Sequence, residues 1–105
     1  VLIYGAGDGG EMVMRELNNN PEWKVVPVGF VDDDPRKHDK LIHGLKVYDG
    51  NGSLTDICRE KEVAEILISV RNLPPERLKR IRAVCEEADV VLKRAHFKID
   101  PVDVI

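Results

Sequence analysis

The chain has 105 residues, a length typical of one domain built around one hydrophobic core. Apolar residues make up 43% and charged residues 33% of the chain, and the formal net charge is −3, which argues against general nucleic-acid binding because that needs a basic surface. No apolar run approaches the length of about 18 residues that a membrane-spanning helix needs, and no signal-peptide pattern is present.

The chain begins with a short apolar run, Val1–Tyr4, which is typical of a buried strand. A natural N-terminus rarely starts inside such a run and without methionine. We therefore expect residues 1–105 to be a single domain excised from a longer protein.

A glycine pattern, G-x-G-x-x-G, follows this strand directly. The first glycine permits a tight turn, the second lets the backbone approach a pyrophosphate, and the third lets the next helix pack closely on the sheet. The N–H groups and dipole of that helix would favour an anion. The residues expected to hold a phosphate group here are Gly5, Ala6, Gly7, Asp8, Gly9 and Gly10.

A helix is predicted over Gly9–Leu17, and a second strand over Val25–Val31 with pairing from Val28, because Pro27 cannot donate. The strand ends in three aspartates and a proline. Asp32 lies 22 residues after Gly10, near the offset expected of a ribose-binding acid, and Asp33 is included in the expected site.

The alternative reading of this acidic stretch is structural, with Asp34 capping a turn before Pro35 and the other two aspartates merely exposed. Arg36 and Lys37 could meet a ribose 2′-phosphate, but we interpret them as surface residues. Residues 36–46 are predicted to be a polar connection.

The next elements are a short strand over Leu45–Tyr48, a turn, and a helix opened by Ser53. A fourth strand is predicted over Glu65–Val70, where the continuous apolar run Ile66–Ile68 is typical of a strand buried on both faces. Three residues at its carboxyl end join the expected site because ligands of parallel sheets bind there: Ser69, Val70 and Arg71.

A helix from Pro74 to about Ala88 and a fifth strand over Val90–Leu92 complete the pattern, and Lys93–Ile105 is not assigned. Cys58 and Cys85 fall on the apolar sides of helices without metal-ligand spacing, so buried reduced thiols typical of a cytosolic setting are expected.

The alternation of strands and helices predicts an α/β fold with a doubly wound parallel sheet of five strands. The expected strand order is 3-2-1-4-5, which places a switch point between the first and fourth strands. Gly5–Gly10, Asp32 and Ser69–Asn72 would line one crevice there.

Three stretches resemble one known family: Val1–Glu11, Pro27–Pro35 and His43–Val47. They look like the Rossmann-like domain of bacterial and archaeal polysaccharide-biosynthesis proteins, the CoA-binding-like domain of the nucleoside-diphosphate-sugar epimerase/dehydratase type. Arg71–Leu78 and Cys85–Ala88 resemble most the version appended to membrane sugar-phosphate transferases. More loosely, the chain is similar to the NADH-sensing domain of redox repressors and to the nucleotide-sugar-binding domain of sugar acyltransferases.

The resemblance implies a nucleotide or nucleotide-sugar ligand, often NAD, with a UDP-sugar or CoA as alternatives. It also implies a membrane-associated parent protein whose remainder is the partner of this domain at the cytoplasmic face. No nucleic-acid partner is expected, and a homodimer is left open.

Catalysis by the chain alone is not expected. A short-chain epimerase or dehydratase needs a Tyr-x-x-x-Lys pair, but Asp8 and Gly52 stand four residues after Tyr4 and Tyr48. The leading hypothesis is therefore a binding module, chiefly for NAD(H). The alternatives are the N-terminal part of a nucleotide-sugar dehydratase or epimerase with its catalytic residues elsewhere, and a dimerisation domain without a ligand.

Overall fold

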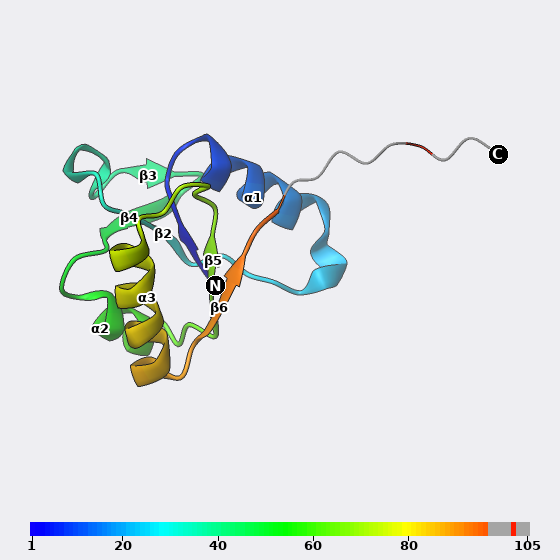
Figure 1. The fold of residues 1–105 in the computed structure, drawn as a ribbon. Helices are drawn as coiled ribbons and strands as arrows, with labels where there is room; N and C mark the ends of the chain where they lie inside the picture. Colours follow the sequence, from blue (N-terminus) through cyan, green and yellow to red (C-terminus); the bar gives the residue numbers. More distant parts are fainter. Residues whose placement is uncertain (97–101, 103–105) are drawn as a thin grey trace.

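The computed structural model describes residues 1–96 and Val102 (Figure 1). The strands are β1 (Leu2–Tyr4), β2 (Gly29–Asp32), β3 (Leu41–Ile42), β4 (Leu45–Asp49), β5 (Glu65–Ile68) and β6 (Val91–Arg94). The helices are α1 (Asp8–Asn19), α2 (Leu54–Glu60) and α3 (Pro75–Ala88), with short 3-10 turns η1 (Pro21–Trp23) and η2 (Pro35–Lys37). Most of the unassigned segment from Lys93 onward lies outside the described residues.

The strands form one mixed sheet in the order β3-β4-β2-β1-β5-β6. All neighbouring strands are parallel except β3 and β4. The five predicted strands correspond to β1, β2, β4, β5 and β6, so their predicted order 3-2-1-4-5 is confirmed. The count of five was wrong, because a sixth strand lies at the edge.

The missed strand β3 lies inside the stretch that was predicted to be a polar connection. His43 and Gly44, with φ of 50° and 78°, turn the chain back so that Ile42 pairs with Leu45. Positive φ at both central residues is what a two-residue hairpin requires. The strand has two residues and exposes Leu41, so no periodic pattern could indicate it.

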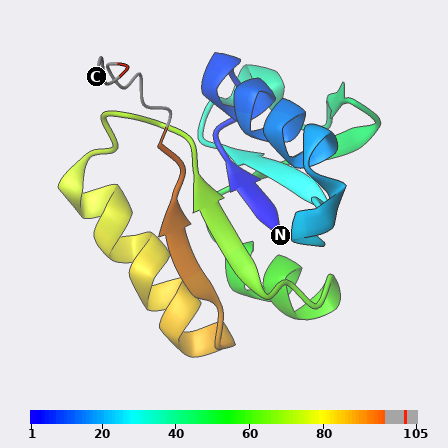
Figure 2. The same ribbon diagram turned by 90° about the vertical axis from the view of Figure 1, so that its right-hand side faces the viewer.

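Helices cover the sheet on both faces, α1 on one and α2 with α3 on the other (Figure 2). Successive residues of a strand point to opposite faces. Ile3 therefore packs in the cluster under α1, whereas Leu2 and Tyr4 belong to the cluster under α2 and α3. All three are buried, as the apolar run Val1–Tyr4 predicted.

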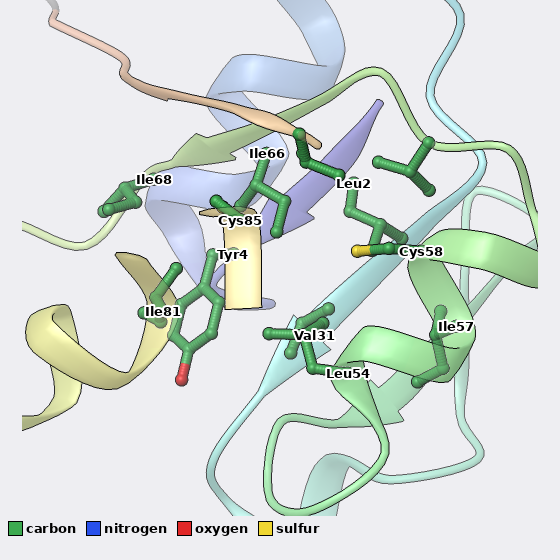
Figure 3. Close-up of a cluster of buried hydrophobic side chains, with 12 residues drawn as sticks. Leu2, Tyr4, Val31, Leu54, Ile57, Cys58, Ile66, Ile68, Ile81 and Cys85 are labelled. Atoms are coloured by element: carbon green, nitrogen blue, oxygen red, sulfur yellow. The ribbon is translucent and has the colours of Figure 1, made fainter. Parts of the chain in front are cut away.

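The larger cluster lies between the sheet and helices α2 and α3 (Figure 3). Both cysteines are in it, as predicted, and they are buried and unbridged. Burial raises the pKa of the Cys58 thiol, and burial together with the neighbouring Cys58 raises the pKa of Cys85 to about 11.

Several predicted boundaries differ by one to four residues. The helix α1 begins at Asp8, and β2 begins at Gly29, although Val28 already donates its N–H to the Val1 carbonyl at 2.9 Å. Ser53 precedes α2 as predicted, but its side chain makes no capping hydrogen bond. Within the described residues, no helix combines the length and the apolar character needed to cross a bilayer.

Candidate functional site

The candidate site is a cavity of about 790 Å³ at the carboxyl ends of the parallel strands. The arrows of β1, β5 and β6 point toward this edge in Figure 2. Of the eleven residues predicted for the site, eight line the cavity: Gly5, Gly7, Gly9, Gly10, Asp32, Ser69, Val70 and Arg71. The structure thus brings together the three separate segments that the sequence indicated, at the switch point between β1 and β5.

Two glycines of the loop, Gly9 beside the pattern and Gly10 at its third position, are required by the close packing of α1. A β-carbon on Gly9 would lie 2.6 Å from the Ser69 carbonyl oxygen, and one on Gly10 would overlap the Gly5 carbonyl oxygen. Gly5 has a φ of 114°, and a β-carbon added there would clash with the Ser69 hydroxyl. These positions hold the first turn of α1 directly against the ends of β1 and β5.

Gly7, the second glycine of the pattern, faces the cavity instead. Among the described residues, a β-carbon there would meet only the Lys37 ammonium, at 3.5 Å. Gly7 is the N-cap of α1, and its backbone, with φ of −99° and ψ of −154°, suits any residue. Packing among the described residues therefore does not require a glycine here, and the space beside its backbone is open to the cavity.

The N-terminus of α1 has no side-chain cap. The first intrahelical bond runs from the Glu11 N–H to the Gly7 carbonyl, so the N–H groups of Asp8, Gly9 and Gly10 precede the helical ladder. Such groups attract an anion, and the helix dipole adds to the attraction. The arrangement fits the diphosphate of a nucleotide.

Asp32 shapes this loop as well as facing the cavity. Its Oδ2 accepts the Ala6 N–H at 2.8 Å and its Oδ1 accepts the Asp34 N–H at 2.8 Å. The predicted site residue Ala6 is thus buried beneath the cavity, with its N–H already bound. Asp8, also predicted, is exposed at the start of α1 and lies outside the cavity lining.

Asp33 points to the other side of the sheet. Its Oδ1 accepts the Tyr4 hydroxyl hydrogen at 2.7 Å and lies 3.3 Å from Arg77 of α3. Burial, and then the bond to Asp33, raise the pKa of the Tyr4 phenol. Asp33 follows the last residue of β2, and its contacts hold it on the α3 side, so it does not line the cavity with Asp32.

Ser69, which follows β5 and lines the cavity, is hydrogen-bonded to the end of β1. Its hydroxyl donates to the Tyr4 carbonyl oxygen at 2.8 Å, and its N–H donates to the same oxygen at 3.0 Å. The side chain is therefore engaged within the protein, and its position supports the turn at Gly5.

Five lining residues were not predicted for the site: Met12, Lys37, Arg94, Ala95 and His96. Lys37 was interpreted as a surface residue, but its ammonium lies 3.7 Å from Asp32 Oδ2. Arg94 reaches the cavity because β6 extends two residues beyond its predicted end. The one sequence signal that could have indicated Lys37 as a cavity residue is its position shortly after a strand that ends in aspartates.

Arg36, by contrast, is held away from the cavity by Asp34. Asp34 accepts the Arg36 N–H at 3.0 Å and pairs with its guanidinium at 3.0 Å. The side-chain bonds to Arg36, followed by the backbone bond, lower the pKa of Asp34 to about 2. The capping role considered for Asp34 is confirmed.

The part of the chain that the structure describes holds no cluster of three or more histidine, cysteine, aspartate or glutamate side chains suited to a metal ion. The chemistry that these residues offer is the binding of an anion by backbone N–H groups, lysine and arginine.

The chain matches the model of one domain family and is similar to two polysaccharide biosynthesis proteins. The model of a CoA-binding domain family matches residues 1–93. The probable polysaccharide biosynthesis protein EpsC of Bacillus subtilis is 34% identical over 97 residues, which are 91% of this chain and 16% of that protein. The capsular polysaccharide biosynthesis protein CapD of Staphylococcus aureus is 29% identical over 92 residues, which are 87% of this chain and 15% of that protein. The chain therefore spans about a sixth of the length of these relatives.

Solved structures share the fold. UDP-D-quinovosamine 4-dehydrogenase from Vibrio fischeri superposes with a TM-score of 0.69 and 24% identity, covering 87% of this chain and 72% of that one. The Rex-family repressor RSP gives a TM-score of 0.72 at 17% identity, over 90% of this chain and 51% of that one. The complex of RSP with β-NADH gives a TM-score of 0.70. These likenesses establish a Rossmann-like fold.

Proposed function

The chain belongs to the CoA-binding domain family, and we propose that it binds NAD(H) or a nucleotide-sugar as a module of a polysaccharide-biosynthesis protein. The observation that carries this proposal is the open face of Gly7 beside the uncapped start of α1. Such a face admits a diphosphate, and no packing requirement within the protein explains a glycine there.

In this proposal the N–H groups of Asp8, Gly9 and Gly10 bind the diphosphate. Asp32 accepts hydrogen bonds from a ribose through the lone pairs that its two backbone bonds leave free. The cavity of about 790 Å³ is of the size that holds a whole nucleotide conjugate. The RSP repressor, which shares the fold, has been solved with β-NADH, which favours a dinucleotide.

We propose further that the chain does not catalyse a reaction by itself. A proton-abstracting tyrosine needs a lowered pKa, whereas burial and Asp33 raise that of Tyr4. Tyr4 also faces away from the cavity, because its hydroxyl donates to Asp33. The reaction, whether of an epimerase, a dehydratase or a membrane sugar-phosphate transferase, would then belong to other parts of the parent protein.

The experiment that tests the proposal is isothermal titration of the chain with NAD+, NADH, NADP+, CoA and UDP-sugars. Saturable binding of at least one of them is expected. Binding of none would refute the proposal, and sedimentation equilibrium on the same sample would then test the alternative of a dimerisation domain without a ligand.

The variant Gly7→Val tests whether the ligand's phosphate binds beside Gly7. Its side chain would occupy the phosphate position, and we expect affinity to fall about tenfold or more, which corresponds to about 1.4 kcal/mol or more of binding free energy. The melting temperature should change little, because the backbone at Gly7 suits any residue. Ala83→Val, which adds similar bulk on the exposed face of α3, is the control and should bind as the wild type does. Unchanged affinity in Gly7→Val would contradict the phosphate cradle.

A further inference from the structure

We infer that the cavity has a second anion-binding position, formed by Arg71 and Arg94, which takes a carboxylate or phosphate on the distal half of the ligand. The inference rests on the proposed function, because it assumes that the diphosphate of a nucleotide occupies the glycine loop. It adds the chemical class of the group beyond that diphosphate.

The two arginines come from neighbouring strands and meet at one edge of the sheet. Arg71 follows β5, and Arg94 ends β6 in register with Ile68 of β5. The Arg94 guanidinium donates from Nη1 to the Arg71 carbonyl oxygen at 3.4 Å. Both residues line the cavity, so two exposed positive charges gather on the wall formed by β5 and β6.

Within residues 1–96, the charges on this wall have no carboxylate partner. Among residues 1–96, Arg36, Arg59 and Arg77 form ion pairs with acids, whereas neither Arg71 nor Arg94 has one within 4.0 Å. Asp32 contributes the acidic group of the cavity lining, and Lys37 already lies 3.7 Å from it. The cavity therefore carries an excess of positive charge at the β5–β6 end, and a bound anion would neutralise it.

This position is separate from the glycine loop. The strand order places β6, which carries Arg94, two strand spacings from β1, about 10 Å at the usual spacing of parallel strands, and β5, which Arg71 follows, lies between them. A diphosphate bound at the start of α1 would thus leave the Arg71–Arg94 pair for a group further along the ligand.

The chemistry of guanidinium defines what that group would be. Arginine presents a planar set of N–H donors that matches the oxygens of carboxylate and phosphate. The same charges repel a cation, so the pyridinium ring of NAD+ is a poor occupant of this position. A nucleoside diphosphate with an acidic distal group is the expected ligand class.

Matched pairs of nucleotides test the inference, measured by isothermal titration against the same protein. UDP-glucose and UDP-glucuronate differ by a distal carboxylate, as do NAD+ and nicotinic acid adenine dinucleotide. ADP and ATP differ by a distal phosphate. We expect the acidic member of at least one pair to bind about fivefold tighter, the effect of a partly solvated ion pair with arginine. The pair that shows this gain identifies the oxyanion as a carboxylate or a phosphate.

Charge-removing variants assign the gain to the two arginines. In Arg71→Met and Arg94→Met, the acidic and neutral members should bind about equally. Arg82→Met, an equal charge change on the exposed face of α3, is the control and should keep the wild-type ratio. Thermal melting of each variant checks that the fold persists.

The outcomes separate the two proposals. If the neutral nucleotides bind and their acidic partners bind no tighter, or if the gain survives in both arginine variants, the second anion position is refuted and nucleotide binding stands. If none of the six nucleotides binds to the wild-type protein, the inference fails, and if NADH, NADP+ and CoA do not bind either, the proposed function fails with it.

Discussion

At the scale of single residues, the glycines of the loop differ in why each is a glycine. Gly10 has no room for a β-carbon because the Gly5 carbonyl oxygen occupies that space, and Gly9 is blocked by the Ser69 carbonyl oxygen. Gly7 has room within the protein and faces the cavity. The glycine loop thus serves packing at Gly9 and Gly10 and, in our proposal, ligand approach at Gly7.

Asp32 both lines the cavity and binds backbone N–H groups of the loop. The variant Asp32→Asn tests how much these bonds stabilise the loop. The carboxylate accepts N–H groups from both Ala6 and Asp34. An asparagine amide offers one oxygen, so its NH2 group would face one of these N–H groups and leave it without an acceptor. We expect a loss of about 1–3 kcal/mol in the free energy of unfolding, measured by urea denaturation.

The control for this prediction is Asp39→Asn. The Asp39 side chain is 82% exposed and pairs only at the surface with Lys46, and asparagine tolerates its φ of 63°. This change should cost little, because exposed ion pairs contribute little to stability. Equal stability losses in the two variants would contradict a specific role for Asp32 in holding the loop.

At the scale of elements, α3 is joined to the sheet by a polar contact as well as by apolar packing. Arg77 Nη1 lies 3.3 Å from Asp33 Oδ1, which also accepts the Tyr4 hydroxyl hydrogen. Arg77 and Arg80 both donate to Asn51 Oδ1 in the loop before α2. The start of α3 is thus connected to β1, β2 and the loop after β4 through one group of side chains.

A double-mutant cycle with Tyr4→Phe and Arg77→Met tests whether this group acts as a unit. Each single change removes one partner of the Asp33 carboxylate and should cost about 1–2 kcal/mol in the free energy of unfolding. Because both act on Asp33, the double variant should depart from the sum of the two by about 0.5 kcal/mol or more. Strict additivity would mean that Asp33 does not couple β1 to α3.

At the scale of the whole molecule, the sheet separates two hydrophobic clusters of different size. The cluster under α2 and α3 is the larger, and it contains both thiols, at 2% and 5% exposure for Cys58 and Cys85. The α1 face carries the smaller cluster and leads to the glycine loop. The stability of the molecule should therefore depend mainly on the face opposite the helix that forms the candidate site.

Because of the buried thiols, we expect the stability contributed by the α2–α3 face to vary with pH. The pKa of Cys85 is raised from 9.0 to about 11 in the folded protein, so the folded state holds its proton more tightly than the unfolded chain. Its contribution to stability is full below pH 9 and is lost as the pH rises toward 11. The wild type should lose unfolding free energy over this range with a slope of up to about 1.4 kcal/mol per pH unit more than Cys85→Ala.

Urea denaturation at several pH values between 8 and 11 measures the two slopes. Cys85→Ala starts from a lower stability because it leaves a small cavity, so the comparison concerns the slopes and not the absolute values. Parallel curves for the two proteins would show that the Cys85 thiol does not titrate differently on unfolding.

Much of the fold could be predicted because its signals are local. An apolar run before Gly5 indicated β1, the apolar stretch Ile66–Ile68 indicated β5, and the alternation of elements indicated a parallel sheet in the observed order. The strand β3 escaped because two residues carry no period, and its pairing depends on the turn at His43 and Gly44.

The sequence by itself determined the glycine loop and the acid that follows the second strand, because both depend on chain chemistry over short spans. Only the tertiary structure decided which neighbouring side chains share the cavity. Asp32 at the end of β2 bonds to the loop while Asp33, the next residue, bonds to Tyr4 and pairs with Arg77 of α3, and the register of β6 on β5 brings Arg94 beside Arg71. These placements follow from contacts between residues far apart in the chain, which no local pattern encodes.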